Sequence, residues 1–117
     1  AAHGLWKARL KNSIDSGRIE MNIETAKKDD ACEFGQWLYS ENVKLFSEDF
    51  HYQRVRSLHA DFHKYVGKVL EYIEQDNITA AKAMMSSQGE YTITSQHLVE
   101  ELMNWSNQLG GSNVTHT

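Results

Sequence analysis

Two histidines stand four residues apart in the segment "LHADFHKYVGKVL", which covers residues 58–70. Residues at this spacing lie on the same face of an α-helix, so the imidazoles of His59 and His63 could bind one metal ion. A helical histidine is, however, more often a packed or solvated residue than a metal ligand. The pair alone leaves both interpretations open, and the choice depends on whether the chain supplies further ligands.

Cys32 and His3 are the candidates for those further ligands. Taken alone, Cys32 is best interpreted as a small buried hydrophobe. Together with His3, His59 and His63 it forms a set of three imidazoles and one thiolate, which suits tetrahedral Zn²⁺ at about 2.0–2.1 Å to nitrogen and about 2.3 Å to sulfur. Aromatic residues close to these four in the sequence are predicted to wall the site off from water: Trp6, Phe34, Trp37 and Phe62. The other histidines are interpreted as packed or solvated: His51, His97 and His116.

Helices must position these residues, because the apolar pattern favours helices throughout. The chain contains no proline, and its glycines lie mostly near predicted breaks. Long helices are predicted at Ala1–Ser16, at His51–Gln75 and from Ile78 to Leu109, the last with a weak point near Gly89.

A short helix that carries Cys32 is predicted between the first two long ones. It is expected to begin near Asp29–Asp30, whose carboxylates suit a helix N-terminus, and the segment "SGRIEMNIETAKK" before it is expected to be a break. The fold class is therefore all-α. We expect a bundle of four main helices plus a short cysteine-bearing helical region, with the zinc site bridging the first, second and third helices. Residues 1–111 are expected to form this bundle and residues 112–117 a flexible tail.

Composition narrows the class of protein. The 117 residues suffice for one domain, and a net charge of −4 without any Lys/Arg run disfavours binding to nucleic acid or directly to a membrane. No apolar run reaches the roughly 18 residues of a membrane span, and no secretory signal is present. A single cysteine favours a reducing, cytoplasmic setting. Because the chain begins without methionine, we expect it to be a piece of a longer protein.

Three motifs, in this order, resemble the chemoreceptor zinc-binding domain family, found on bacterial chemoreceptors and some diguanylate cyclases. They are "HGLW" at 3–6, "CEFGQW" at 32–37 and "HADFH" at 59–63, with twenty-five and twenty-one residues between them. The resemblance implies that the zinc ligands are His3, Cys32, His59 and His63. Gln36 stands where relatives often carry lysine, which is not a ligand position. Gly35, which has no Cβ, is expected to let a neighbouring helix approach the short helix closely.

The resemblance also implies a function. Four protein ligands leave no open position for substrate, so we expect a non-enzymatic module. A zinc-bound thiolate is open to oxidants, and the family is associated with sensing zinc and hypochlorous acid, so Cys32 is hypothesised to be a redox switch. The expected partners are a second copy of the chain, an attached methyl-accepting signalling domain and, through it, the chemotaxis kinase complex.

Several alternatives remain open at this point. Zinc occupancy itself could be the signal, the module could regulate a diguanylate cyclase, or zinc could only staple the helices together. The end "GGSNVTHT" favours a module at the C-terminus of its parent, and hence a chemoreceptor. An iron or oxygen-binding bundle is the alternative from another class. It is disfavoured because neither of the two longest predicted helices contains a Glu-x-x-His pair.

Overall fold

The computed structural model describes residues 2–19, 21–30, 32–40, 46 and 48–110. Within these ranges the chain forms helices and no strand, which confirms the all-α class. The helices are α1 (Ala2–Ser16), α2 (Ile23–Lys27), α3 (Glu33–Leu38), α4 (Phe50–Glu74), α5 (Ile78–Met85) and α6 (Glu90–Gly110). The predicted tail at 112–117, with His116, lies outside the described residues. In the described part of the chain, no helix is long and apolar enough to cross a membrane.

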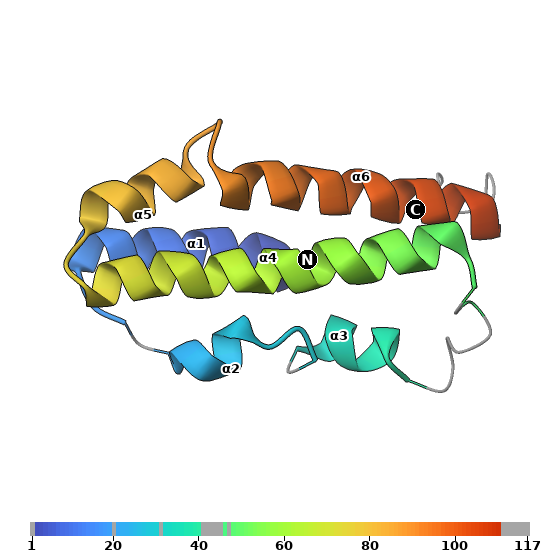
Figure 1. Cartoon of the computed structure of the whole chain (residues 1–117), viewed down its shortest axis with the longest axis horizontal. Coiled ribbons are helices and arrows are strands. Elements are labelled where there is room, and N and C mark those ends of the chain that lie inside the picture. Colours follow the sequence, from blue (N-terminus) through green and yellow to red (C-terminus); the bar gives the residue numbers. More distant parts are fainter. Residues whose placement is uncertain (1, 20, 31, 41–45, 47, 111–117) are drawn as a thin grey trace.

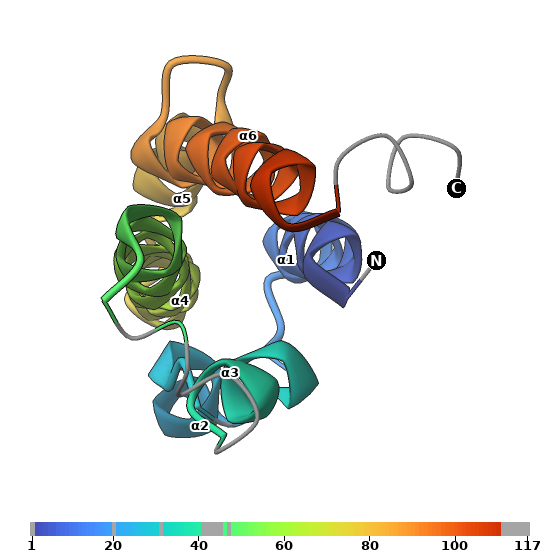
Figure 2. The ribbon, with the colours of Figure 1, turned by 90° about the vertical axis from the view of Figure 1, so that its right-hand side faces the viewer.

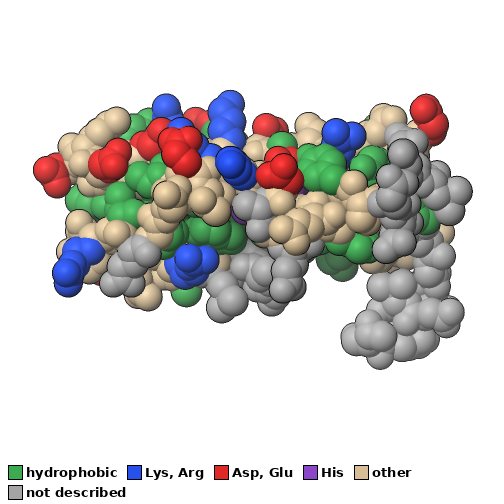
Figure 3. All heavy atoms as spheres, turned by 90° about the horizontal axis from the view of Figure 1, so that it is seen from below, with side chains coloured by type: hydrophobic (Ala, Val, Ile, Leu, Met, Phe, Trp, Pro, Cys, Tyr) green, Lys and Arg blue, Asp and Glu red, His purple; other side chains and the backbone are tan. Residues whose placement is uncertain are grey.

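Helix α4 is the central element, and it packs against α1, α2, α5 and α6. Figure 1 shows α1, α4 and α6 running along the long axis, with α2 and α3 together on one side of α4. The end-on view in Figure 2 shows α2 and α3 on the side of the bundle away from α5 and α6. On the face that Figure 3 shows, basic and acidic side chains are interspersed.

The sequence of α4 explains its central place. Asp49 caps its N-terminus by accepting hydrogen bonds from the backbone amides of His51 and Tyr52. Apolar side chains recur along one face every three or four residues and are fully buried: Val55, Phe62, Val66, Val69 and Leu70. His59 and His63 fall within the same buried face. The two candidate metal-binding histidines therefore lie in the core.

Two predicted segments differ in detail from the structure. The helix expected from Ile78 to Leu109 is divided into α5 and α6, and the break falls at the weak point predicted near Gly89. A Cβ at Gly89 would lie 2.0 Å from the carbonyl oxygen of Met84, so only glycine fits this tight turn. The segment after the first helix, expected to be a break, contains α2. Asn22 caps that helix by accepting a hydrogen bond from the amide of Thr25 at 2.9 Å.

Glu101 ties α6 to the first turns of α4. His51 Nδ1 donates to Glu101 Oε1 at 2.6 Å, and Arg54 Nε donates to Oε2 at 3.3 Å. The Glu101 side chain is only 9% exposed. The hydrogen bond from His51 lowers the pKa of the Glu101 carboxyl, and Arg54 acts in the same direction, while desolvation opposes both. His51, which was interpreted as packed or solvated, is thus half-buried and has a structural partner.

Replacing Glu101 tests this link. We expect Glu101→Gln to lower the free energy of unfolding near neutral pH by roughly 1.5–3 kcal/mol, because hydrogen bonds to a charged group are lost. Since the pKa of Glu101 is lower in the folded than in the unfolded chain, its stabilisation is present above the usual value of 4.5 and is lost as the pH falls further. Urea unfolding should therefore show the gap between wild type and variant narrowing between neutral pH and a pH well below 4.5. Glu100→Gln, at the exposed neighbouring position, is the control. A gap of equal size at both pH values would contradict the assignment.

Candidate metal centre

Cys32 is held in place by the start of α3. It is the N-cap residue of this helix, with extended backbone, and its Sγ accepts a hydrogen bond from the amide of Gly35 at 3.3 Å. Side-chain acceptors at the N-cap satisfy amides that the first turn leaves unpaired. The prediction that Asp29–Asp30 starts the helix is corrected here, because these residues form the turn before it and the cysteine itself is the cap.

The structure brings Cys32 together with both histidines of α4. The Cys32 Sγ lies 3.4 Å from His59 Nε2 and 3.6 Å from His63 Nε2, and the three candidate ligand atoms lie within 4.8 Å of one another. Tetrahedral zinc with bonds of about 2.3 Å to sulfur and about 2.05 Å to nitrogen requires a sulfur–nitrogen separation of about 3.6 Å. Both sulfur–nitrogen separations therefore match those expected around one zinc ion.

Both imidazoles are buried, and His63 is oriented by a backbone group. His59 and His63 are 0% and 1% exposed. The carbonyl oxygen of Ala26, in α2, accepts a hydrogen bond from His63 Nδ1 at 2.9 Å. A carbonyl only accepts, so Nδ1 carries the proton and Nε2 presents its lone pair toward Cys32. The pKa of His63 is lowered overall, because the effect of burial exceeds the opposing effects of the Ala26 carbonyl and the charge of Asp29. Its neutral form, the one that binds metals, is thereby favoured.

Most of the predicted aromatic residues surround the imidazoles. Phe34 packs edge-on against His59 with ring centroids 5.0 Å apart. Trp6 and Phe62 pack against His63, with centroids at 6.1 Å and 5.4 Å. Trp37 is different, because it contacts Phe34 and the ring of Trp105 and remains 43% exposed. It joins α3 to α6 and does not wall the centre directly.

The fourth predicted ligand lies at the start of α1. His3 belongs to the first turn of that helix, and its side chain lies outside the described residues. Trp6 lies one turn after His3 in α1, and its ring contacts that of His63. Helix α1 therefore reaches the centre at Trp6. The assignment of His3, with Cys32, His59 and His63, as the ligand set stays a prediction. Of the remaining histidines that the structure describes, His51 pairs with Glu101, and His97 is exposed.

Gly35 allows a close backbone contact, as predicted from its lack of a Cβ. The segment that it contacts is not the neighbouring helix that was expected. A Cβ at Gly35 would lie 1.6 Å from the backbone oxygen of Asp29 and 3.1 Å from the Cα of Asp30. The close contact is therefore with the turn before α3, and not with another helix. This packing holds the amide of Gly35 against the sulfur of Cys32.

No residue pattern indicated that the Ala26 carbonyl orients His63. A backbone acceptor has no residue-type signature, and the helix that presents it was expected to be a break. Its only local sign is Asn22, a favoured N-cap residue, placed before Ile23–Lys27.

The comparison with protein families agrees with this geometry. The model of the family described as the chemoreceptor zinc-binding domain matches residues 3–70, more than half of the chain, and this stretch includes all three motifs. Neither the curated proteins nor the solved structures contain a match to the chain.

Replacing Gly35 tests whether the turn holds the cysteine in place. We expect Gly35→Ala to weaken zinc binding by about 10–100-fold, the range typical for groups that orient metal ligands, because the new Cβ displaces the turn that carries Cys32. Competition with a chromogenic chelator measures this. Gln36→Ala is the control, since Gln36 follows Gly35 in the same helix and is exposed. Equal affinities of the two variants would contradict the steric role.

Proposed function

Because the chain belongs to the chemoreceptor zinc-binding domain family, we propose that it is a sensory module in which Cys32 is the redox-responsive zinc ligand. The observation that carries the proposal is the approach of the Cys32 sulfur to two buried imidazole nitrogens, at 3.4 Å and 3.6 Å. The cofactor of the family is zinc, and bound zinc keeps the cysteine as a thiolate. The thiolate is the form of cysteine that oxidants attack.

The chemistry proposed for Cys32 is a two-electron oxidation. The thiolate attacks hypochlorous acid, a sulfur–oxygen bond forms, and the oxygen–chlorine bond breaks, which gives sulfenic acid and chloride. Sulfur is oxidised and chlorine is reduced, so no further reactant is needed. A sulfenic acid is a weaker donor than a thiolate. Cys32 would then detach from the centre while the histidines remain in α4.

Detachment has a structural consequence because α3 is a marginal helix. It contains six residues, and isolated helices shorter than about 12–15 residues are unstable in water. At its C-terminal end Leu38 is fully buried, and its carbonyl accepts a hydrogen bond from Tyr52 Oη at 2.8 Å. At its N-terminal end the contacts are those of Cys32 and Phe34 with the centre. Loss of the sulfur contact therefore loosens the first turn of α3 while Leu38 stays anchored.

We extend the proposal to the module's partners. Four protein ligands, with His3 as the fourth, leave no open coordination position, so the module is non-enzymatic and acts through an attached signalling domain in the cytoplasm. In a chemoreceptor that domain controls the chemotaxis kinase complex. Zinc occupancy is a second signal that the same ligands could report. In that case the bound metal changes, whereas in the redox switch the thiolate changes. Regulation of a diguanylate cyclase is the alternative output.

The proposed homodimer has a candidate surface on α6. Val99 and Met103 lie one turn apart and are 52% and 61% exposed, away from the buried face of Leu98 and Trp105. Exposed apolar side chains that share a face are typical of interaction surfaces.

Oxidation tests the switch. We expect one equivalent of hypochlorous acid, added to zinc-loaded protein, to increase hydrogen exchange about tenfold or more in residues 32–38 and to leave Phe62–Ile73 of α4 protected, because only α3 depends on the sulfur. Mass spectrometry of the intact chain and its peptides measures both the added oxygen on Cys32 and the exchange.

Cys32→Ser is the control, since it retains the methionines, which are also oxidised. Its exchange should not respond to the oxidant. Complete sulfenic acid formation with unchanged exchange in α3 would contradict the switch, and absence of one zinc per chain in elemental analysis would contradict the metal centre.

The dimer surface has its own test. We expect wild-type protein to be dimeric in size-exclusion chromatography with light scattering, and Val99→Glu with Met103→Glu to shift it to monomer, because charges are costly to bury without partners. His97→Glu with Asn104→Glu, on another exposed face of α6, should leave the dimer intact. A monomeric wild type, or loss of the dimer in both double variants, would contradict this surface.

A further inference from the structure

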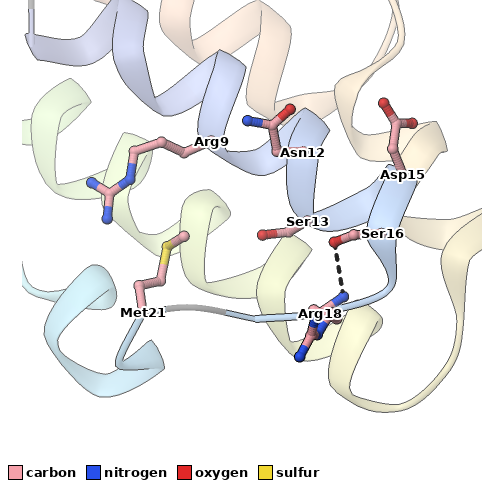
Figure 4. A pocket seen from close by; sticks show the side chains of 7 residues that line it. All are labelled: Arg9, Asn12, Ser13, Asp15, Ser16, Arg18 and Met21. Atoms are coloured by element: carbon pink, nitrogen blue, oxygen red, sulfur yellow. Dashed lines mark hydrogen bonds between the residues drawn. The ribbon is translucent and has the colours of Figure 1, made fainter.

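A cavity of about 580 Å³ lies beside the second half of α1 and the segment that follows it. Figure 4 shows it between Arg9, on α1, and Arg18, after the helix. This volume is within the range of about 300–1,000 Å³ that is typical of small-molecule sites. None of the residues that line it is a predicted zinc ligand or a member of the aromatic wall.

The polar groups that line the cavity are mostly hydrogen-bond donors. Besides the two guanidinium groups, Asn12 supplies an amide, and Ser13 and Ser16 supply hydroxyls. Ser13 is 4% exposed, and in Figure 4 its hydroxyl points into the space that Arg9 and Arg18 bound. Met21 closes one side with an apolar surface.

Among the residues that the structure describes, no carboxylate forms an ion pair with the two arginines of this cavity, Arg9 and Arg18. Arg9 stacks over the ring of Trp6, with Cζ 4.4 Å from the centroid. The one carboxylate in the lining belongs to Asp15, which points away from both arginines in Figure 4. In a chain whose net charge is −4, two arginines at one cavity, neither in an ion pair with a described residue, are a local positive site.

We propose that this cavity binds a small anion whose oxygens accept hydrogen bonds, as a phosphate ester or a carboxylate does. The planar guanidinium group donates two parallel hydrogen bonds to such oxygens, which lysine cannot do. The Ser13 hydroxyl and the Asn12 amide provide further donors from α1. The inference is independent of the redox switch, because no zinc ligand contributes to the cavity.

Calorimetric titration of the zinc-loaded protein tests the site, with sodium phosphate and sodium succinate as probes at constant ionic strength. We expect saturable binding with a dissociation constant of about 1 mM or below for at least one probe. Preference for phosphate identifies a phosphoryl ligand, and preference for succinate a carboxylate. In nuclear magnetic resonance spectra, the side-chain amide of Asn12 and the backbone amide of Gly17 should shift on binding, while the amides of α5 should not.

The variants separate a built site from general charge attraction. Arg9→Gln with Arg18→Gln should weaken binding about tenfold or more, equivalent to about 1.4 kcal/mol. Lys7→Gln with Lys11→Gln removes the same charge from exposed positions of α1 and should change affinity less than about threefold. Arg18→Gln alone preserves the Arg9–Trp6 contact and should still weaken binding. Absence of saturation by both probes at about 20 mM, or equal losses in the two double variants, would overturn the proposal.

Discussion

The convergence of one sulfur and two imidazole nitrogens is the interaction on which this structure depends. Cys32 is the only cysteine of the chain, and it reaches His59 and His63 from a helix of six residues. That helix is too short to persist without tertiary support. Binding of structural zinc is worth roughly 10–16 kcal/mol in zinc-finger peptides, comparable to the roughly 5–15 kcal/mol stability of a whole domain. A metal bound at this point would therefore tie the short helix to α4.

The ligands are divided between a stable and a marginal element. Helix α4 has 25 residues, a capped N-terminus and a buried face that includes both histidines. Helix α3 depends on the contact of Cys32 at one end and on the burial of Leu38 at the other. In the proposed switch, a change in the sulfur would move α3 relative to α4. This asymmetry suits a sensor better than a uniformly rigid metal staple would.

A series of contacting aromatic rings connects the candidate metal centre with α6. Phe34 packs on His59, Trp37 packs on Phe34, and Trp105 of α6 packs on Trp37. Trp105 also contacts Tyr52 of α4, whose hydroxyl holds the end of α3. The end of the bundle that carries the C-terminal half of α6 is therefore in physical contact with the element that bears the cysteine. Trp37 belongs to the family motif, yet its position indicates coupling between helices more than enclosure of the metal.

The sequence alone determined the helical class, the long helices and the pairing of His59 with His63, because apolar periodicity and the i,i+4 spacing are local properties. Its motifs also singled out Cys32, which the fold brings to that pair. Only the tertiary structure revealed that Cys32 caps its own helix, that Gly35 packs on the turn at Asp29, and that the carbonyl of Ala26 orients His63. These contacts involve backbone atoms, which every residue type shares. Their partners are decided by how the chain folds in space, so residue identities could not reveal them.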